Sequence, residues 1–470
     1  MAVLGPRAGT AALLILVLFA GLPFVRPAQA ERVLGLTWDR TYLSVVPGTS
    51  SVEQTRDGGF IMSALSRGLW VMKANAAGLP EWQREYTDQS GIVTQTRDGG
   101  YILVGGNRLL KLDHMGNPEW SKAYDIAGGK NFISARQTRD GGFIALGSWT
   151  PPGLDFSRAW LVKFGLVGNV EWQHAYAGSA FVEPYSVRET SDGGFVVAAS
   201  LPLNNSQRAW IFKTDPIGGM VWQKAYAVPV GNSVIDDHAF SIRQTHDGGY
   251  VVGGDVIVWG HSAYLPFQVQ LYSYAWVLRL DSQGDIVWQR LFGGGGFTQH
   301  AYVSEMSDDG FIVSGRFEPA NLGGPLVGLG GPFLLRLDAY GNMVWQKIYG
   351  EVNDFLIQAH QTRDGGIIAV GSMVGGSPNC CDNLAWALKV DSNGSIRGCA
   401  VGVQSNATLT DTSATVTSTT IASTNTNATG TSTDVAVTTP SILAVQNQCH
   451  LQNQQGMDED KHAIATPPLP

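Results

Sequence analysis

"QTRDGGF", residues 54–60, decides the fold because the chain repeats it. Six further copies, the ones at Glu189 and Glu305 being looser, begin at Gln95, Gln137, Glu189, Gln244, Glu305 and Gln361. Asp-Gly and Gly-Gly between β-prone runs signal hairpins, since glycine adopts the positive φ of tight turns without steric cost. An aspartate that recurs in all seven repeats is better explained by a structural role in each turn than by a role in catalysis. We therefore interpret seven aspartates as scaffold: Asp57, Asp98, Asp140, Asp192, Asp247, Asp308 and Asp364.

Each repeat contains a second hairpin. In Ala159–Tyr176, "AWLVKFGLVGNVEWQHAY", two apolar runs flank a Gly-Asn turn, so a repeat has four strands. The Asp-Gly-type turns are 41 to 61 residues apart. Four-stranded repeats of that length predict the blades of a β-propeller. The alternative, a β-solenoid, has shorter coils and would not show two hairpin turns in each.

Tryptophan placement predicts the number of blades. The second hairpin ends in a Trp-x-x-x-Tyr or Trp-x-x-x-Phe strand in six repeats, beginning at Trp82, Trp120, Trp172, Trp222, Trp288 and Trp345. The seventh repeat lacks this pair, and the missing copy stands at the start of the chain as Trp38 and Tyr42. We therefore predict an all-β fold, a seven-bladed propeller of four-stranded blades, closed by an N-terminal strand within residues 34–42. A second recurring aromatic position predicts core residues at Trp70, Trp160, Trp210, Trp276, Phe333 and Trp386.

The two ends differ in composition from the repeats. Residues 1–30 have one early Arg, an apolar run and an Ala-x-Ala site, which predicts a secretory signal peptide and a secreted protein, periplasmic or extracellular. The expected domains are the propeller at 31–400, a Thr/Ser-rich extension at 401–449 and a disordered tail at 450–470. The net charge of -8 argues against nucleic acid as a partner, and no later stretch is long and apolar enough for a membrane span. We expect a monomer.

The Thr/Ser-rich extension admits three interpretations. It could be an extended stalk, a disordered linker, or Thr-rich strands that pack beside the ring. Export makes the four cysteines candidates for disulfides, and three pairings are open. We favour Cys399 with Cys449, which bracket the extension; Cys380 and Cys381 would then form a loop disulfide.

The sequence "K-x-D" recurs ahead of the second turn, for example as Lys111 with Asp113 and Lys213 with Asp215. Such pairs could suggest an electrostatic site. Because the blades space them around the rim, we interpret them as exposed partners at strand ends, each of small energetic weight.

The loops that join hairpins vary greatly between repeats three to seven, and binding residues often lie in such loops. Trp149 and Trp259 are the two tryptophans outside the repeat positions, and both fall in these insertions. The candidate aromatic platform for a glycan or a protein partner comprises Trp149, Trp259, His261, Tyr264, Tyr272 and Tyr274. The alternative is that the loops bury these aromatic side chains themselves.

Chemistry-bearing motifs are scarce. Asp236, Asp237 and His238 precede an inner strand, with His300 placed similarly one repeat later, so a bound cation is conceivable. The other repeats lack metal-ligand spacing, and we assign no metal site and no cofactor. The chain has no G-x-S-x-G elbow, H-E-x-x-H, C-x-x-C or P-loop, and we assign no catalytic residue.

The segments Lys111–Trp120, "KLDHMGNPEW", and Arg279–Trp288, "RLDSQGDIVW", resemble the tryptophan-docking repeat of quinoprotein alcohol dehydrogenase-like propellers. The whole repeat is similar to bacterial exported propellers built from Asp-Gly-Gly repeats, most of which have no assigned activity. The quinoprotein resemblance implies pyrroloquinoline quinone with calcium or a lanthanide, in some cases stacked on adjacent cysteines such as Cys380-Cys381. Seven blades instead of eight, a shorter Asp-to-Trp spacing and the late position of the cysteines depart from that pattern.

From the sequence we hypothesise a non-catalytic binding or scaffold protein that uses its variable-loop face. The alternatives are a quinone- or metal-dependent oxidoreductase and an enzyme acting on polysaccharide. Function is a property of a site on the fold rather than of the fold itself, so the choice depends on which side chains the ring brings together.

Overall fold

The computed structural model describes residues 36–397, apart from short segments, and seven strands between 403 and 447. The segments not described within 36–397 are 43–48, 66–67, 88–90, 126, 178–180, 204–205, 229–233, 262–267, 294–295, 320–329, 351–353 and 375–382. All four cysteines and the proposed signal peptide fall outside the described residues, as does the tail after residue 447.

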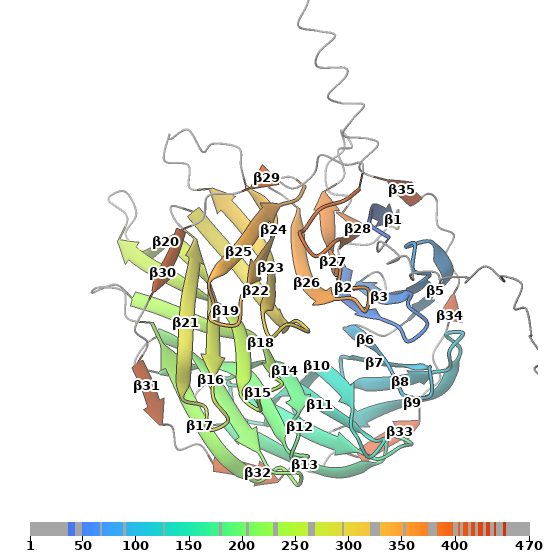
Figure 1. Ribbon diagram of the computed structural model, residues 1–470. Helices are drawn as coiled ribbons and strands as arrows, with labels where there is room; N and C mark the ends of the chain where they lie inside the picture. Colours follow the sequence, from blue (N-terminus) through green and yellow to red (C-terminus); the bar gives the residue numbers. More distant parts are fainter. Residues whose placement is uncertain are drawn as a thin grey trace, which may run out of the picture. The chain divides into compact units, whose positions relative to one another are not determined.

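Strands make up all the regular structure of the described residues, and Figure 1 shows them arranged as blades around a common centre. Among these residues there is no helix that could cross a membrane. Every blade is an antiparallel sheet whose first strand is innermost. The chain forms a seven-bladed β-propeller, as the spacing of the Asp-Gly-Gly turns predicts.

The first three blades are regular four-stranded meanders. Blade one consists of β2 (Thr49–Gln54), β3 (Phe60–Leu65), β4 (Leu69–Ala74) and β5 (Pro80–Tyr86). Blade two consists of β6 (Ile92–Gln95), β7 (Tyr101–Gly105), β8 (Arg108–Leu112) and β9 (Pro118–Asp125). Blade three consists of β10 (Gly129–Gln137), β11 (Phe143–Thr150), β12 (Arg158–Phe164) and β13 (Val170–Ala177).

The next three blades are meanders too, and the strands of blade five are longer. Blade four consists of β14 (Glu183–Glu189), β15 (Phe195–Leu203), β16 (Ser206–Thr214) and β17 (Met220–Ala227). Blade five consists of β18 (Val234–Gln244), β19 (Tyr250–His261), β20 (Gln268–Leu280) and β21 (Ile286–Gly293). Blade six consists of β22 (Gly296–Glu305), β23 (Phe311–Pro319), β24 (Gly331–Leu337) and β25 (Met343–Ile348).

The seventh blade is assembled from both ends of the ring. Three of its strands are consecutive: β26 (Phe355–Gln361), β27 (Ile367–Val374) and β28 (Asn383–Val390). The fourth is β1 (Trp38–Tyr42), which pairs antiparallel with β28 so that Trp38 lies opposite Lys389. The prediction that an N-terminal strand closes the ring is confirmed.

The Thr/Ser-rich extension adds a fifth strand to every blade. Its strands are β29 (Val403–Gln404), β30 (Thr408–Asp411), β31 (Thr415–Ser418), β32 (Ala422–Asn425), β33 (Thr429–Ser432), β34 (Val437–Thr438) and β35 (Val445–Asn447). They pair, in that order, with the outer strands of blades six, five, four, three, two, one and seven. Of the three interpretations of this segment, strands beside the ring are what the structure has.

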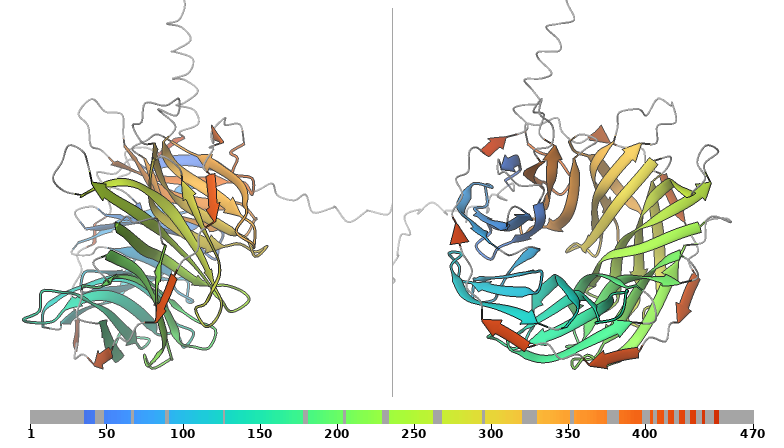
Figure 2. Two further views of the ribbon diagram at one scale, coloured as in Figure 1. Left: turned by 90° about the vertical axis from the view of Figure 1, so that its left-hand side faces the viewer. Right: turned by 180° about the vertical axis from the view of Figure 1, so that it is seen from behind.

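We call these seven strands the belt. The chain leaves blade seven after β28, passes around the other six blades in reverse order, and returns to blade seven, where β35 pairs with β1. The red strands on the outside of the ring in Figures 1 and 2 are this belt. Outer strands expose unpaired backbone groups that invite pairing with other chains, and the belt strands satisfy part of that edge in each blade.

The Asp-Gly-Gly aspartate orders its own turn, as expected of scaffold. In blade three, Thr138 Oγ1 donates to Asp140 Oδ1 at 2.5 Å, and the amide of Gly142 donates to the same oxygen at 2.9 Å. The second oxygen of Asp140 pairs with Lys163 Nζ at 2.8 Å. The same set of contacts recurs in the other blades with local variations.

The interpretation of the "K-x-D" pairs as exposed partners is wrong. The side chain of Lys111 is only 5% exposed, and it pairs with Asp98 of the Asp-Gly-Gly turn at 2.8 Å rather than with Asp113. Asp113 instead accepts hydrogen bonds from the amides of Met115 and Asn117 in the second turn. Lys111 and Asp113 are close in sequence, which suggested a pair. The lysine side chain instead lies buried beside the first hairpin turn, where it pairs with Asp98.

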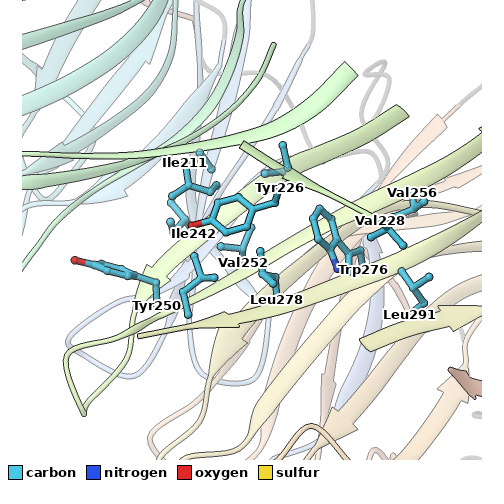
Figure 3. Packing of buried hydrophobic residues seen from close by; sticks show 14 of the residues in the cluster. Ile211, Tyr226, Val228, Ile242, Tyr250, Val252, Val256, Trp276, Leu278 and Leu291 are labelled. Carbon is cyan, nitrogen blue, oxygen red and sulfur yellow. The ribbon is translucent and has the colours of Figure 1, made fainter. Parts of the chain in front are cut away.

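Aromatic side chains join neighbouring blades, as Figure 3 shows between blades four and five, where Tyr226 and Ile211 pack near Trp276 and Leu278. A second recurring contact is polar. The tyrosine of the Trp-x-x-x-Tyr strand donates to a glycine carbonyl in the next blade at 2.6 to 2.8 Å, in the pairs Tyr42–Gly78, Tyr86–Gly116, Tyr124–Gly168, Tyr176–Gly218, Tyr226–Gly284 and Tyr349–Gly394.

Tyr176→Phe is expected to lower the free energy of unfolding by about 1–2 kcal/mol, because it leaves the carbonyl of Gly218 without its buried donor. The ring itself should stay in place, since blade five has Phe292 at the same position. Urea denaturation would show a lower midpoint with an unchanged slope. Tyr340→Phe, which alters an exposed tyrosine, is the control and should have no effect. Equal stability of the two variants would contradict the expectation.

Candidate ligand site in the central cavity

The first strands of all seven blades together line a cavity of about 180 Å³. These inner strands are β2, β6, β10, β14, β18, β22 and β26, and each contributes at least one side chain. The cavity is therefore a property of the closed ring and of no single blade. The side chains that line it occupy equivalent repeat positions, which can be compared from blade to blade.

One repeat position sets the charge of the cavity. It lies four residues before the aspartate of the Asp-Gly-Gly turn, on the inner strand. Around the ring it is occupied by Glu53, Thr94, Arg136, Arg188, Arg243, Ser304 and His360. Blades three, four and five thus carry arginine consecutively, and all three arginines line the cavity.

The three guanidinium groups have no carboxylate contact: within the described part of the chain, Arg136, Arg188 and Arg243 form no ion pair. Burial lowers the pKa of Arg188 well below 12.5, and the charges of Arg136 and Arg243 add to that effect. Burial and the charge of Arg136 lower the pKa of Arg243 to about 10. The Nε of Arg188 is buried with no hydrogen-bond partner among the described atoms.

Glu53 is the acidic member of this position, and its charge favours the protonated form of all three arginines. Its Oε2 already accepts a hydrogen bond from the amide of Gln95 at 3.0 Å. At this repeat position there are thus one carboxylate and three guanidinium groups. Like charges enclosed together favour the binding of an anion.

Ser304 and His360 lie beside the arginines but are not arranged for catalysis. His360 Nδ1 is 2.7 Å from Ser304 Oγ, and Arg243 Nη2 is 3.2 Å from the same ring nitrogen and 3.3 Å from Nε2. A serine hydrolase holds its histidine with a carboxylate, which stabilises the imidazolium. Here burial and the arginines lower the pKa of His360 well below 6.5, so the ring is a poor base.

A β-bulge brings apolar side chains to the cavity. In blade four the pairing of β14 with β15 shifts between Pro184 and Ser186, which leaves Tyr185 as the extra residue. In blade five the shift between Ala239 and Ser241 does the same for Phe240. Bulges commonly redirect a side chain in this way, and both rings line the cavity.

The aromatic side of the cavity is centred on Phe240. Its ring lies 4.9 Å from that of Tyr185, at an interplanar angle of 80°, and 6.3 Å from that of Tyr302. On the side away from the cavity's arginine position, His238 stacks on Phe240 at 5.8 Å and 10°. Blades four, five and six therefore supply consecutive aromatic side chains, and we call Tyr185, Phe240 and Tyr302 the aromatic wall.

The predicted aromatic platform is divided between blades. Trp259, Tyr272 and Tyr274 belong to the β19–β20 hairpin of blade five, where the two tyrosine rings meet edge to face at 5.6 Å. Trp149 lies on β11 of blade three, with blade four between, and its indole donates to the carbonyl of Ala127 at 2.9 Å. Tyr264 and the side chain of His261 lie outside the described residues. The described members thus form a blade-five group and a separate Trp149.

The residues considered for a cation have protein partners. Asp237 is fully buried and pairs with Arg208 at 2.8 Å, and burial raises its pKa to about 7. Asp236 accepts from the indole of Trp259 at 2.7 Å, while His238 bonds to Asp255 at 2.9 Å. His300 contacts the ring of Phe240. These contacts account for the polar groups without a metal.

Within the described residues, His246, Glu305 and Asp309 form a group that could hold a metal ion, with ligand atoms within 4.8 Å of one another. It lies at the turns of blades five and six. The side chains of His246 and Asp309 are more than two thirds exposed, and His246 Nδ1 already contacts Glu305 at 3.4 Å. Exposed carboxylate groups of this kind are common without a metal, and we assign none here.

No protein-family model and no curated protein matches the chain. Among solved structures, a protein of unknown function from Bacteroides caccae is 12% identical, covers 66% of this chain and 93% of its own, and has a TM-score of 0.34. A rhamnogalacturonan lyase of Bacillus licheniformis is 10% identical over 76% of each chain, with a TM-score of 0.25. A eukaryotic initiation factor is 7% identical over 76% of this chain and 99% of its own, with a TM-score of 0.30. Identities and scores this low carry no functional argument.

A quinone with calcium, implied by the quinoprotein resemblance, does not fit the cavity. Calcium requires six to eight oxygen ligands, with carboxylates prominent among them. The described side chains that line the cavity include three arginines and no carboxylate. The adjacent Cys380 and Cys381 lie outside the described residues. We derive no reaction step through this cofactor.

Sequence reasoning missed the three arginines, although a signal for them exists. When the seven repeats are aligned on the turn aspartate, the column four residues earlier reads Glu, Thr, Arg, Arg, Arg, Ser and His. Neighbouring columns are nearly uniform, because scaffold needs the same residue in each blade. A column that varies at one end of an inner strand indicates a site on the ring axis.

Proposed function

We propose that this chain is an exported, non-catalytic binding protein that holds a small anion in its central cavity. The observation that carries the proposal is the set of three unpaired arginines in consecutive blades. Enclosing three like charges without partners destabilises a fold, and a bound anion relieves that repulsion through charge-assisted hydrogen bonds. Guanidinium groups are well suited to this role because their planar forks match carboxylate and phosphate oxygens.

The surroundings support binding rather than turnover. A reaction needs a base, a nucleophile or a metal near the bound group. The described residues of the cavity offer His360, whose pKa is lowered well below 6.5, and serine hydroxyl groups without a carboxylate-held histidine. Hydrogen-bond donors predominate around the three arginines, and this favours the binding of an anion.

The test is thermal unfolding of the chain without residues 1–30 in acetate, phosphate or sulfate, against chloride at equal ionic strength. A ligand at 100 times its dissociation constant stabilises the fold by about 2.7 kcal/mol. We expect at least one of these anions to raise the melting temperature of the wild type and of Arg397→Gln, an exposed-arginine control. The same anion should give no increase with Arg188→Gln. Equal shifts in Arg188→Gln and the control would show that the cavity is not the site.

A further inference from the structure

We infer that the anion is an aromatic carboxylate, whose carboxylate binds Arg188 and Arg243 while its ring lies against the aromatic wall. The inference rests on the proposed function and specifies the ligand of the same cavity. Four features of the described residues lead to it: the two arginines, the position of the aromatic wall, the engagement of nearby polar groups, and the cavity's volume.

Arg188 and Arg243 line both the central cavity and a second hollow of about 350 Å³, whose other lining residues are Gln244, His246 and the acids Glu189 and Glu305. Glu183, near the start of inner strand β14, accepts a hydrogen bond from Tyr185, and Asp255 on β19 is paired with His238. A carboxylate entering the cavity is drawn to the guanidinium groups of Arg188 and Arg243, which form no ion pair among the described residues.

The aromatic wall lies next to the arginine position on the same strands. Tyr185 precedes Arg188 by three residues, and Phe240 precedes Arg243 by three. A ligand whose negative group meets the arginines thus has its body beside these rings. Tyr185 directs its hydroxyl to Glu183 at 2.6 Å, which turns the hydroxyl away from any ligand in favour of the ring face.

Two serine hydroxyl groups that line the cavity, one beside the wall and one in blade one, are engaged by the protein. Ser241 Oγ accepts the amide of Val303 at 3.0 Å, and Ser51 Oγ accepts the amide of Val93 at 3.1 Å. A sugar acid carries several hydroxyl groups, each of which needs a partner when buried. An aromatic ring needs none, and stacked or edge-to-face contacts with the wall favour it.

The volume suits one small ring. A dry apolar cavity of about 150 Å³ is known to accept benzene in another protein. This cavity measures about 180 Å³, which leaves room for a ring with one short acidic group. A larger body would have to extend beyond this cavity, for example into the second hollow next to Arg188 and Arg243.

The experiment compares benzoate, acetate and glucuronate by isothermal titration calorimetry with the wild type, Arg188→Gln and Phe240→Leu. We expect benzoate to bind about tenfold more tightly than acetate, because its ring leaves water on binding. Phe240→Leu should remove that advantage and leave acetate affinity unchanged, whereas Arg188→Gln should weaken both. Tyr302→Leu is a second wall variant, in case Phe240→Leu does not fold, and each variant's fold is checked by circular dichroism.

The outcomes separate the two proposals. Equal affinity for acetate and benzoate, both lost in Arg188→Gln, would overturn the aromatic ligand and leave the anion site intact. Tighter binding of glucuronate than of benzoate would overturn it in favour of a sugar acid. The absence of binding by all three probes would count against the aromatic carboxylate, and the phosphate and sulfate arms described above would then decide whether the anion site itself stands.

Discussion

Arg188→Met is expected to raise the free energy of unfolding by about 1–4 kcal/mol in dilute, phosphate-free buffer. Most core substitutions destabilise a protein, so the sign of this change is diagnostic. The gain arises because methionine fills much of the same space without a charge. The substitution removes the hydrogen bond that Arg188 donates to the carbonyl of Val187 at 2.7 Å. It also removes the repulsion between Arg188 and the charges of Arg136 and Arg243.

Urea denaturation of wild type and variant, each with and without the anion found by the thermal test, measures this change. With saturating anion the order should reverse, since only the wild type gains binding energy. The matched control is Arg84→Met on the outer strand of blade one, where the side chain donates to the carbonyl of Met115. That variant should be no more stable than wild type. If Arg188→Met destabilises in anion-free buffer, the guanidinium is scaffold and the site assignment fails.

The second large effect concerns the disulfide that we favour. Cys399→Ser is expected to lower the free energy of unfolding by about 4 kcal/mol on the chain-entropy estimate for a loop of 50 residues. Both cysteines lie outside the described residues, so the geometry comes from their neighbours. The amide of Arg397 donates to Thr37 Oγ1 at 2.9 Å, and Asn447 lies opposite Arg40 on β1. Arg397 and Asn447 each lie two residues before a cysteine, and both contact the N-terminal residues 37–40.

The register also separates the other cysteines. Residues 380 and 381 precede the start of β28, whereas residue 399 follows its end, and eight extended residues span about 26 Å. β35 runs antiparallel to β1 toward the Trp38 end, which lies opposite Lys389 near the end of β28. Peptide mapping without reduction should therefore find Cys399 joined to Cys449. A peptide linking Cys399 to Cys380 or Cys381 would refute the pairing, and Cys380→Ser should cost less stability than Cys399→Ser.

Repetition made the fold predictable from the sequence. Seven copies of one turn and six of one tryptophan pattern average out the ambiguity of any single strand, and the displaced copy at Trp38 identified the closing strand. The same repetition misled us at Lys111, because a local pattern says nothing of which neighbour a buried side chain meets. Pairing across a hairpin is decided by register, which the sequence contains only indirectly.

The site was harder to predict because it consists of departures from the repeat. Attention to long insertions pointed to Trp149 and Trp259, which the structure places on different blades. The three arginines occupy a regular strand position, where variation is easily taken for noise. Two physical facts separate them from scaffold: their charges are close enough to act on one another, and none of the three forms an ion pair with a carboxylate among the described residues.

The number of belt strands equals the number of blades. Each of these strands pairs with one blade, and the belt starts at blade six and ends on blade seven, so all seven strands are paired only when every blade is present. A gene duplication that added one blade would leave that blade without its outer strand, so the belt restrains this protein from evolving by the gain or loss of repeats.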